Sequence, residues 1–430
     1  MDNIVVRTFN PTSDEQAMNE VIRKSFNSAT ANAYPLPPDR FVIIAEIDGK
    51  IVGHTSVRPM LLHMGNALVR TANLHMVATD PDYQRLGVGH AMMDKANEIS
   101  RQERLAISIL ETPVPEFYAL KGWEIVGNRV SLLVNRKDIE AAASQAKIDL
   151  QFRDGTLDHV DLYVDLRETV AKKCWLFAHA NKDYLGGLIA PACQGSLVDF
   201  FHEIWQDEKL VGYVFGTRDS SAKEGEPLKI GVREMILETY TLDIVARVFS
   251  FLLEFDEEFE VVNAGNFVMP ELETIMNSFG GTASNPGGNK DMVRVSMVKE
   301  LLDELHDVID RELVAFLKRT RKKKGEEFLL DVDGERVLLS CGSGHLQTWV
   351  INEIPEGIPA FSLTRNDLAR VVMGTASPSS LVNEGKAGCT TDLVLEQLDA
   401  MFPPRPIVIN YSNHLYQAYL EEMGIDHESS

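Results

Sequence analysis

Apolar positions in the first third of the chain alternate between the period of a strand and the period of a helix. Apolar or alternating runs predict five strands, at 4–9, 41–47, 51–57, 68–79 and 105–110. The turn Asp48-Gly49-Lys50 joins the second and third of these as a hairpin. Helices are predicted from a cap at Ser13, from Leu86 to Arg101, and around Tyr118. A further strand at 131–134 is expected to complete this α/β unit near Arg136.

The rest of the chain continues this mixture of helices and strands. Its middle predicts helices at 161–177 and 236–255 and a strand at 210–216. The glycine-rich residues 279–290 lack the Gly-Lys-Ser/Thr of a phosphate loop and are predicted to form a linker. The final third predicts a strand near Met292, a helix from Leu301 to Phe316, a hairpin at 328–339, strands at 347–351 and 361–364, and a helix capped by Thr364 or Asn366. An apolar face at Leu415, Tyr419 and Leu420 predicts a helical tail.

Length, charge and cysteine content narrow the class of protein. A chain of 430 residues exceeds what one core usually supports, so two or three domains are expected. The net charge of −22 argues against a nucleic-acid partner and is compatible with a cationic substrate, although it serves solubility equally well. Four scattered cysteines, no signal peptide and no apolar run of about 18 residues predict a cytoplasmic protein with no membrane partner. The basic run at 318–324 is interpreted as a helix end rather than a nucleic-acid or lipid site.

The clearest chemical signal is the loop that follows the strand at 68–79. Gly87 and Gly89 let the backbone approach a ligand, and the first N–H groups of the next helix point toward it. Arg85 adds a charged donor. Met92 stands where a dinucleotide fold needs its third glycine, and the loop lacks the lysine of a P-loop. The loop is therefore predicted to bind a diphosphate.

Two motifs resemble those of known families. Gln84-Arg85-Leu86-Gly87-Val88-Gly89, followed by Tyr118 and Gly122-Trp123, resembles the acyl-CoA loop and the tyrosine helix of the GNAT N-acetyltransferases. Leu363-Thr364-Arg365-Asn366-Asp367-Leu368 resembles a motif of sterol carrier protein type two domains. Taken together, the chain is similar to the enhanced intracellular survival (Eis) acetyltransferases.

That resemblance implies a mixed α/β (α+β) fold with two tandem GNAT-like domains, the second degenerate, followed by a sterol-carrier-like α+β domain with a helical tail. The implied boundaries are 1–145, 146–290 and 291–430. No second acyl-CoA loop occurs in the middle segment, so only the first domain is expected to hold CoA. The resemblance also implies a homo-oligomer, in this family a hexamer.

The GNAT resemblance implies acetyl-CoA as the cosubstrate. Backbone N–H groups at 85–90 would hold its diphosphate, the strand at 77–79 would pair with the pantetheine arm, and residues 113–114 would line the thiol end. The predicted contacts are Val77, Ala78, Thr79, Arg85, Leu86, Gly87, Val88, Gly89, His90, Pro113 and Val114. Tyr118 is the candidate general acid, because a phenol with a pKa of about 10 is protonated at neutral pH. No metal is expected.

The group that deprotonates the acceptor amine is not identified by the sequence. A glutamate used by one GNAT branch falls on Asn73 here, and His75 on the same strand face could act through water. Eis-like enzymes use their C-terminal carboxylate, but this chain continues beyond Asn410, and its end is expected to pack away from the site.

The residues together predict an acetyl-CoA-dependent N-acetyltransferase that acts on a primary amine of a small molecule or peptide. The alternative is a lipid- or acyl-chain-binding carrier protein with an inactive GNAT unit. Intact Gln84, Arg85, Gly87, Gly89 and Tyr118 favour the enzyme.

Overall fold

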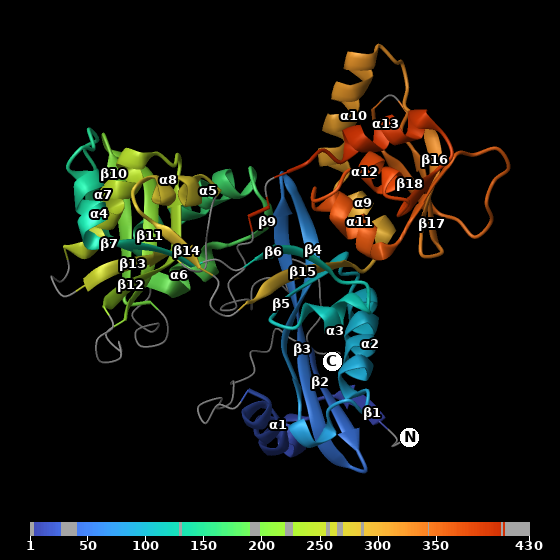
Figure 1. The fold of residues 1–430 in the computed structure, drawn as a ribbon, viewed down its shortest axis with the longest axis horizontal. Helices are drawn as coiled ribbons and strands as arrows, with labels where there is room; N and C mark the ends of the chain where they lie inside the picture. The colour runs from blue at the N-terminus through green and yellow to red at the C-terminus, as the bar shows by residue number, and fades with distance from the viewer. Residues whose placement is uncertain are drawn as a thin grey trace.

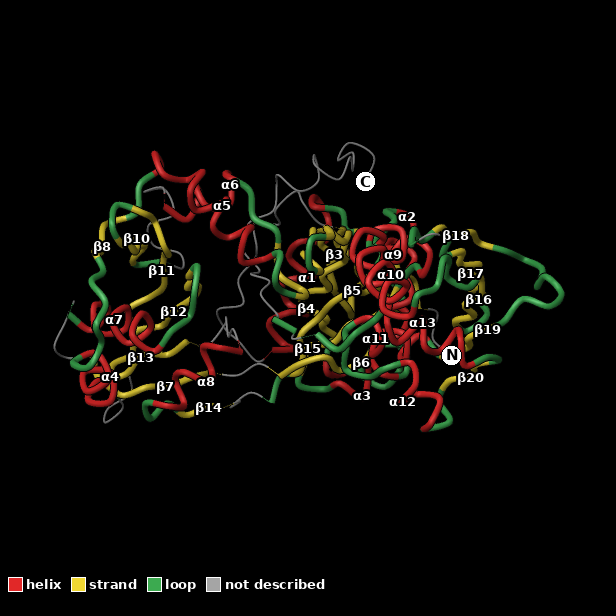
Figure 2. The backbone as a smooth tube through the Cα atoms, turned by 90° about the horizontal axis from the view of Figure 1, so that it is seen from above, coloured by secondary structure: helices red, strands yellow, loops and turns green. Residues whose placement is uncertain are grey.

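The computed structural model describes residues 4–26, 41–128, 131–189, 198–219, 227–254, 259–264, 270–284, 288–342, 344–405 and 407–408. These residues form three β-sheets with helices packed on them, a mixed α/β architecture that agrees with the predicted fold class. In Figure 1 the second sheet lies at one end of the molecule, the third lies at the other end, and the first runs between and below them. Figure 2 shows the same order from above.

The first sheet has the strand order β1-β2-β3-β4-β5-β15-β6, and β9 pairs with the far end of β3. Its strands are β1 (Ile4–Thr8), β2 (Phe41–Ile47), β3 (Lys50–Met64), β4 (Ala67–Thr79), β5 (Ile107–Thr112), β6 (Glu124–Asn128), β9 (Trp175–Ala178) and β15 (Lys290–Val295). Alternate residues of β2 face opposite sides: Ile43 packs in the core under α2 (Val88–Gln102), whereas Ile44 packs in the core under α1 (Pro11–Phe26). The two helices therefore cover opposite faces, and a register slip of one residue would exchange the faces.

The second sheet, which together with its helices is called the second unit, has the order β8-β10-β11-β12-β13-β7-β14. Its strands are β7 (Ser131–Asn135), β8 (Gln151–Asp154), β10 (Phe200–Gln206), β11 (Lys209–Asp219), β12 (Leu228–Leu237), β13 (Phe259–Ala264) and β14 (Thr282–Ser284). Its helices are α4 (Arg136–Ala143), α5 (Val160–Ala171), α6 (Lys182–Ile189), α7 (Leu242–Leu253) and α8 (Pro270–Ser278). The order matches the first sheet strand for strand, and each sheet has a parallel pair at the same place, β4 with β5 and β12 with β13. This internal correspondence agrees with two tandem units of one fold.

Two strands join other sheets than their predicted domains imply. The strand predicted at 131–134 forms as β7, but it pairs with β13 and β14 of the second sheet and does not complete the first unit. The strand near Met292 forms as β15, and it enters the first sheet between β5 and β6. Residues 131–284 thus supply all seven strands of the second sheet, whereas the first sheet takes its inner strand β15 from beyond them, so no contiguous segment of the first unit supplies the first sheet completely.

The third sheet, which together with its helices is called the third unit, has the order β18-β17-β16-β19-β20. Its strands are β16 (Glu327–Val332), β17 (Glu335–Ser340), β18 (Gln347–Val350), β19 (Ala360–Leu363) and β20 (Ala387–Cys389). The helices beside it are α9 (Val298–Glu304), α10 (His306–Thr320), α11 (Arg365–Val372), α12 (Pro378–Asn383) and α13 (Asp392–Met401). The predicted hairpin at 328–339 is present, and Thr364 caps α11 by accepting the N–H of Asp367. None of the helices in the described part of the chain has the length and apolarity needed to cross a membrane.

Several predicted helix ends are wrong because tertiary pairing or a cap overrides local periodicity. The helix predicted at 161–177 ends at Ala171, and Trp175–Ala178 forms β9 against β3. The helix predicted at 236–255 begins at Leu242, because Thr241 caps it and the preceding residues belong to β12. The helix predicted from Leu301 to Phe316 is divided at Leu305 into α9 and α10.

Two shorter expectations also change. At the start of α1 the side chain that accepts a backbone N–H is that of Asn10, not the predicted Ser13: Asn10 Oδ1 accepts the Thr12 N–H at 3.0 Å. The predicted linker at 279–290 contains β14, and its last residue begins β15. The predicted helical tail through Leu415, Tyr419 and Leu420 lies outside the described residues.

Candidate active site

The parallel strands β4 and β5 separate toward their carboxyl ends. They pair only over Thr71–Asn73 with Ile107–Ile109, although β4 continues to Thr79 and β5 to Thr112. The separation starts beside a β-bulge, where the register of β3 and β4 shifts between His54 and Ser56 and Met76 has φ +53°. Beyond the paired residues, the facing edges of β4 and β5 can accept an extended ligand as an added strand.

The loop after β4 ends at a helix start that no side chain caps. Arg85 has φ +64°, and Gly87, the N-cap of α2, has φ +95° without a capping side chain. The first hydrogen bond of the helix runs from the Ala91 N–H to the Gly87 carbonyl at 3.0 Å. The N–H groups of Val88, Gly89 and His90 therefore have no acceptor within the helix and point beyond its end, where an anion would bind.

Asp80 fixes the beginning of this loop. Its side chain is buried, its Oδ1 accepts the Asp82 N–H at 3.1 Å, and its own N–H donates to the Val52 carbonyl at 2.8 Å. Lys24 lies 3.4 Å from Asp80 Oδ2. The loop is thus attached to β3 and α1 at its first residue, which leaves the glycine-containing part to follow the ligand.

The short helix α3 (Pro115–Ala119) brings the predicted tyrosine beside the loop. Phe117 lies between them: its ring stacks on His90 with centroids 4.7 Å apart and meets Tyr118 edge-on at 4.8 Å. A Cβ on Gly89 would lie only 2.8 Å from Phe117 Cζ. The two motifs separated in sequence therefore form one cluster, and Gly89 is needed for this close approach as well as for the loop.

Tyr118 is buried with 6% of its surface exposed. Burial raises the pKa of its hydroxyl to about 12, and a hydrogen bond with the Thr112 side chain acts in the opposite direction. The phenol consequently carries its proton throughout the physiological range. Thr112 and Phe117 are not among the predicted site residues, although Phe117 begins the stretch that contains Tyr118. Only their contacts in the fold reveal them.

The other predicted residues contribute in different ways. The side chain of Ala78 is buried in the core under α1, and the Thr79 carbonyl accepts the Ser25 hydroxyl at 2.8 Å, so these residues could reach a ligand mainly through the backbone. Val88 is buried in the core under α2, whereas Leu86 and Val114 are half exposed. Pro113 and Val114 lie at the end of β5, beside the separated edge.

The candidate bases lie on β4. Asn73 is buried in the last paired position with β5, and the His75 carbonyl accepts the hydroxyls of Thr55 and Ser56 at 3.4 Å each. The residues predicted near the chain end lie outside the described residues. The arrangement therefore assigns no base.

In the second unit the corresponding helix start is that of α7, and a side chain caps it. Thr241 caps α7 by accepting the Ile244 N–H through its side chain, and Asp243 places a negative charge in the first turn. β12 and β13 also stay paired from Leu228 to Val232, with one register shift after Leu228. These features argue against an anion site there and agree with a single diphosphate loop in the described part of the chain.

Replacing Gly89 by alanine is expected to lower the free energy of unfolding by about 1–3 kcal/mol, because the new methyl group displaces the Phe117 ring. Urea denaturation of the full chain measures this change. Gly186→Ala is the matched control: Gly186 lies in α6 with its nearest neighbour 3.7 Å from the added Cβ, so this substitution should be neutral or stabilising. Equal stability of both variants would show that the contact does not constrain Gly89.

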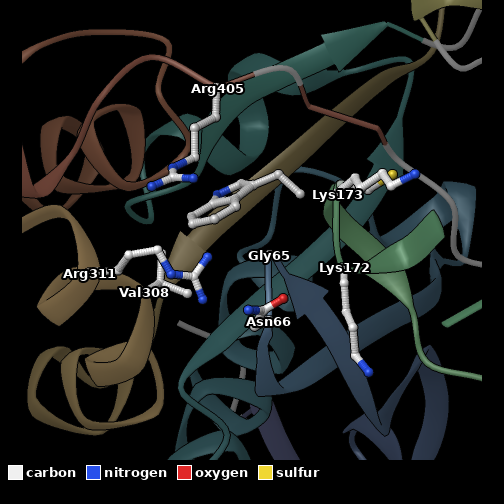
Figure 3. A pocket seen from close by; sticks show the side chains of 9 residues that line it. Gly65, Asn66, Lys172, Lys173, Val308, Arg311 and Arg405 are labelled. Carbon is white, nitrogen blue, oxygen red and sulfur yellow. The ribbon is translucent and has the colours of Figure 1, made fainter. Parts of the chain in front are cut away.

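A pocket separate from this cluster lies at the turn between β3 and β4 (Figure 3). Its lining comes from all three parts of the fold: Gly65, Asn66, Lys172, Lys173, Cys174, Trp175, Val308, Arg311 and Arg405. The Arg405 guanidinium lies over the Trp175 ring at 4.8 Å and pairs with Glu312 at 2.7 Å. None of the predicted acetyl-CoA contacts lines this pocket, so it is separate from the candidate active site.

Comparisons with known proteins agree with this geometry. Residues 6–126 match the family model described as an acetyltransferase (GNAT) domain. That segment contains the splayed strands, the loop and Tyr118, and it ends within β6.

Solved structures extend the similarity along the chain. A GCN5-related N-acetyltransferase from Anabaena variabilis ATCC 29413 is 15% identical, with a TM-score of 0.68, over 94% of this chain and 98% of its own. A probable N-acyltransferase from Enterococcus faecalis V583 is 13% identical, with a TM-score of 0.69, over 95% and 98%. Eis1 from Mycobacterium abscessus is 14% identical, with a TM-score of 0.62, over 95% and 100%. At these identities the likeness shows the fold alone: the chain shares the multidomain fold of these structures.

Proposed function

We propose that this protein is an acetyl-CoA-dependent N-acetyltransferase whose acceptor is a primary amine of a small molecule or peptide. The observation that carries the proposal is the joint placement of three features: the separated β4 and β5 edges, the uncapped start of α2, and the buried Tyr118. They suit, in that order, the pantetheine arm, the diphosphate and the thiol of CoA.

In the proposed complex, N–H groups at the start of α2 donate to the diphosphate, and Arg85 adds a cationic donor. The pantetheine arm pairs with the backbone of Val77–Thr79 beyond the last β4–β5 pair. Binding at both places would hold the thioester beside α3, so that orientation lowers the barrier before any proton moves.

The reaction would transfer the acetyl group directly. The amine nitrogen attacks the thioester carbonyl, a C–N bond forms, the C–S bond breaks, and the acceptor loses one proton. Tyr118 donates a hydrogen bond to the departing sulfur and passes its proton as the bond breaks. Because its pKa is raised to about 12 by burial, the resulting phenolate regains a proton readily. The proton lost by the neutral amine balances the proton passed to sulfur, so the products are the amide and CoA thiol. An acceptor that enters as ammonium releases one further proton.

The remaining expectations stay predictions. These are the general base, a homo-oligomer such as a hexamer, a cytoplasmic location, the domain boundaries at 145 and 290, and the sterol-carrier-like character of the third unit. The alternative carrier function predicts binding of fatty acids without acetyl transfer.

Calorimetric titration of the full chain with CoA is expected to give one equivalent per chain, because α2 starts uncapped whereas α7 is capped by Thr241. The same protein should acetylate at least one member of an amine panel that includes polyamines, aminoglycosides and lysine peptides. Two equal CoA sites would contradict the inference that the second unit has no site for the diphosphate. Fatty-acid binding without any CoA binding would favour the carrier function instead.

A further inference from the structure

Two histidines and a glutamate from separate elements meet where β9 joins the first sheet. β9 pairs antiparallel with the end of β3, placing Phe177 opposite His63, and the His179 N–H donates to the Leu61 carbonyl at 3.0 Å. His179 is two residues beyond Phe177, so it lies diagonally across from His63 on the same face. Glu168 reaches this face from α5. One ligand atom from each of the three residues lies within 4.8 Å of the other two.

We propose that His63, Glu168 and His179 bind one divalent transition-metal ion, with Zn²⁺ as the best-suited ion, at the seam between the first sheet and the second unit. Two imidazoles and one carboxylate are a common ligand set for this ion. His63 lies more than one hundred residues before Glu168 and His179, so the three ligands form no short metal-binding motif in the sequence.

The distances between the side chains suit a metal better than a direct hydrogen bond. His63 Nε2 lies 3.4 Å from His179 Nδ1 and 3.9 Å from Glu168 Oε1. Two nitrogens bound tetrahedrally at 2.0–2.1 Å from Zn²⁺ are about 3.3–3.4 Å apart. A typical hydrogen bond to nitrogen or oxygen is shorter, at about 2.7–3.2 Å. The two nitrogens are therefore already at metal-ligand separation, and the carboxylate oxygen lies about half an ångström too far from His63 Nε2.

The protonation of the cluster fits metal binding. Burial, together with the smaller effect of His179, lowers the pKa of His63 to about 4, so the His63 imidazole is neutral at physiological pH. Burial acts to raise the pKa of Glu168, but Lys172 outweighs it and keeps the group ionised. Lys172 Nζ binds Oε2 of Glu168 at 3.0 Å, whereas Oε1 is the oxygen that faces His63.

The proposed metal site is independent of acetyl transfer. His54, beside the bulge of the candidate active site, and His63 lie nine residues apart on β3, which corresponds to about 30 Å along an extended strand. His63 belongs to the first sheet, while Glu168 lies on a helix of the second unit. A bound ion would thus join the two units and stabilise their contact.

Calorimetric titration with ZnCl2 tests the proposal on the full chain after removal of metal by a chelator. We expect one site per chain in the wild type and a Kd raised at least about tenfold in both His179→Ala and Glu168→Gln, since loss of even an outer partner of a metal ligand costs about 10–100-fold. His306→Ala is the matched control: His306 is exposed and pairs with Asp307 in the third unit, so its Kd should be unchanged.

A further variant tests the charge environment. Lys172→Gln removes the ammonium group that competes for Glu168, so we expect a several-fold lower Kd for Zn²⁺, whereas a cluster without metal would give no change. Visible absorption of bound Co²⁺ reports tetrahedral ligands, and circular dichroism checks that each variant is folded. Equal Zn²⁺ affinity of the wild type, His179→Ala and Glu168→Gln, all folded, would overturn the proposal, and so would the absence of a wild-type site.

Discussion

Gly87→Glu is expected to abolish CoA binding by the full chain, raising the Kd at least about a hundredfold in calorimetry. Gly87 is the uncapped N-cap of α2, and the substitution places a carboxylate at the helix end where the diphosphate must bind. The added Cβ would lie 3.8 Å from Ile4 Cδ1, an ordinary contact, so the side chain has room. The remaining cost is backbone strain at φ +95°, about 1–2 kcal/mol.

Gly357→Glu separates that strain from the loss of the anion site. Gly357 also has a positive φ, +80°, with open space around its Cβ, and it lies in the third unit before β19. It adds the same charge and similar strain, so its CoA affinity should equal that of the wild type. Undiminished CoA binding by folded Gly87→Glu would remove the loop from the proposed site.

Tyr118→Phe is expected to lower kcat for acetyl transfer by at least about tenfold, because general acid–base catalysis typically contributes about 10²–10⁴-fold, with little change in acetyl-CoA affinity. The ring that packs against Phe117 and Trp123 remains, and only the hydroxyl beside Thr112 is lost. Steady-state kinetics with a saturating amine measures the effect. Wild-type turnover would leave Tyr118 a packing residue.

Two comparisons sharpen this result. Tyr240→Phe removes a hydroxyl that donates to the Met235 carbonyl at 2.8 Å in the second unit, and it should leave kcat unchanged.

The pKa of Tyr118 is raised from 10 to about 12 by burial, so the donor form persists through pH 10 and any earlier alkaline fall in rate must come from another group. By the same shift, the folded protein holds this proton more tightly than the unfolded chain. Its contribution to stability is complete below pH 10 and is lost between pH 10 and about 12.

The sequence predicted those parts of the fold and site that depend on neighbouring residues. The hairpin of β2 and β3, the helix after Gly87 and the cap at Thr364 follow from turn, periodicity and capping signals, and they formed as expected. The backbone geometry of the loop before α2 belongs to this group, because a left-handed glycine and exposed N–H groups are local properties, whereas its binding of CoA stays a prediction.

The remaining features depend on contacts between distant segments. The sequence pattern predicts residues 175–178 as the end of a helix. They form a strand instead, because β3 extends beyond its hairpin with β2 and leaves a free edge for pairing. The partners of β7 and β15 could not be chosen by pattern, since an apolar strand fits either sheet. The approach of Phe117 to Gly89 likewise appears only in the folded chain, and the same holds for His63 with His179.

The late position of β15 in the sequence also sets the order in which the first sheet can form during synthesis. β15 emerges about 180 residues after β5, and until then β5 and β6 lack the strand that lies between them. At a translation rate of about 5–20 residues per second, this gap lasts roughly 10–35 s. During that time two apolar strand edges are exposed on the ribosome and can pair with other nascent chains. Slower translation between β6 and β15, or loss of a chaperone that shields these edges, should therefore reduce the yield of folded protein more than its final stability.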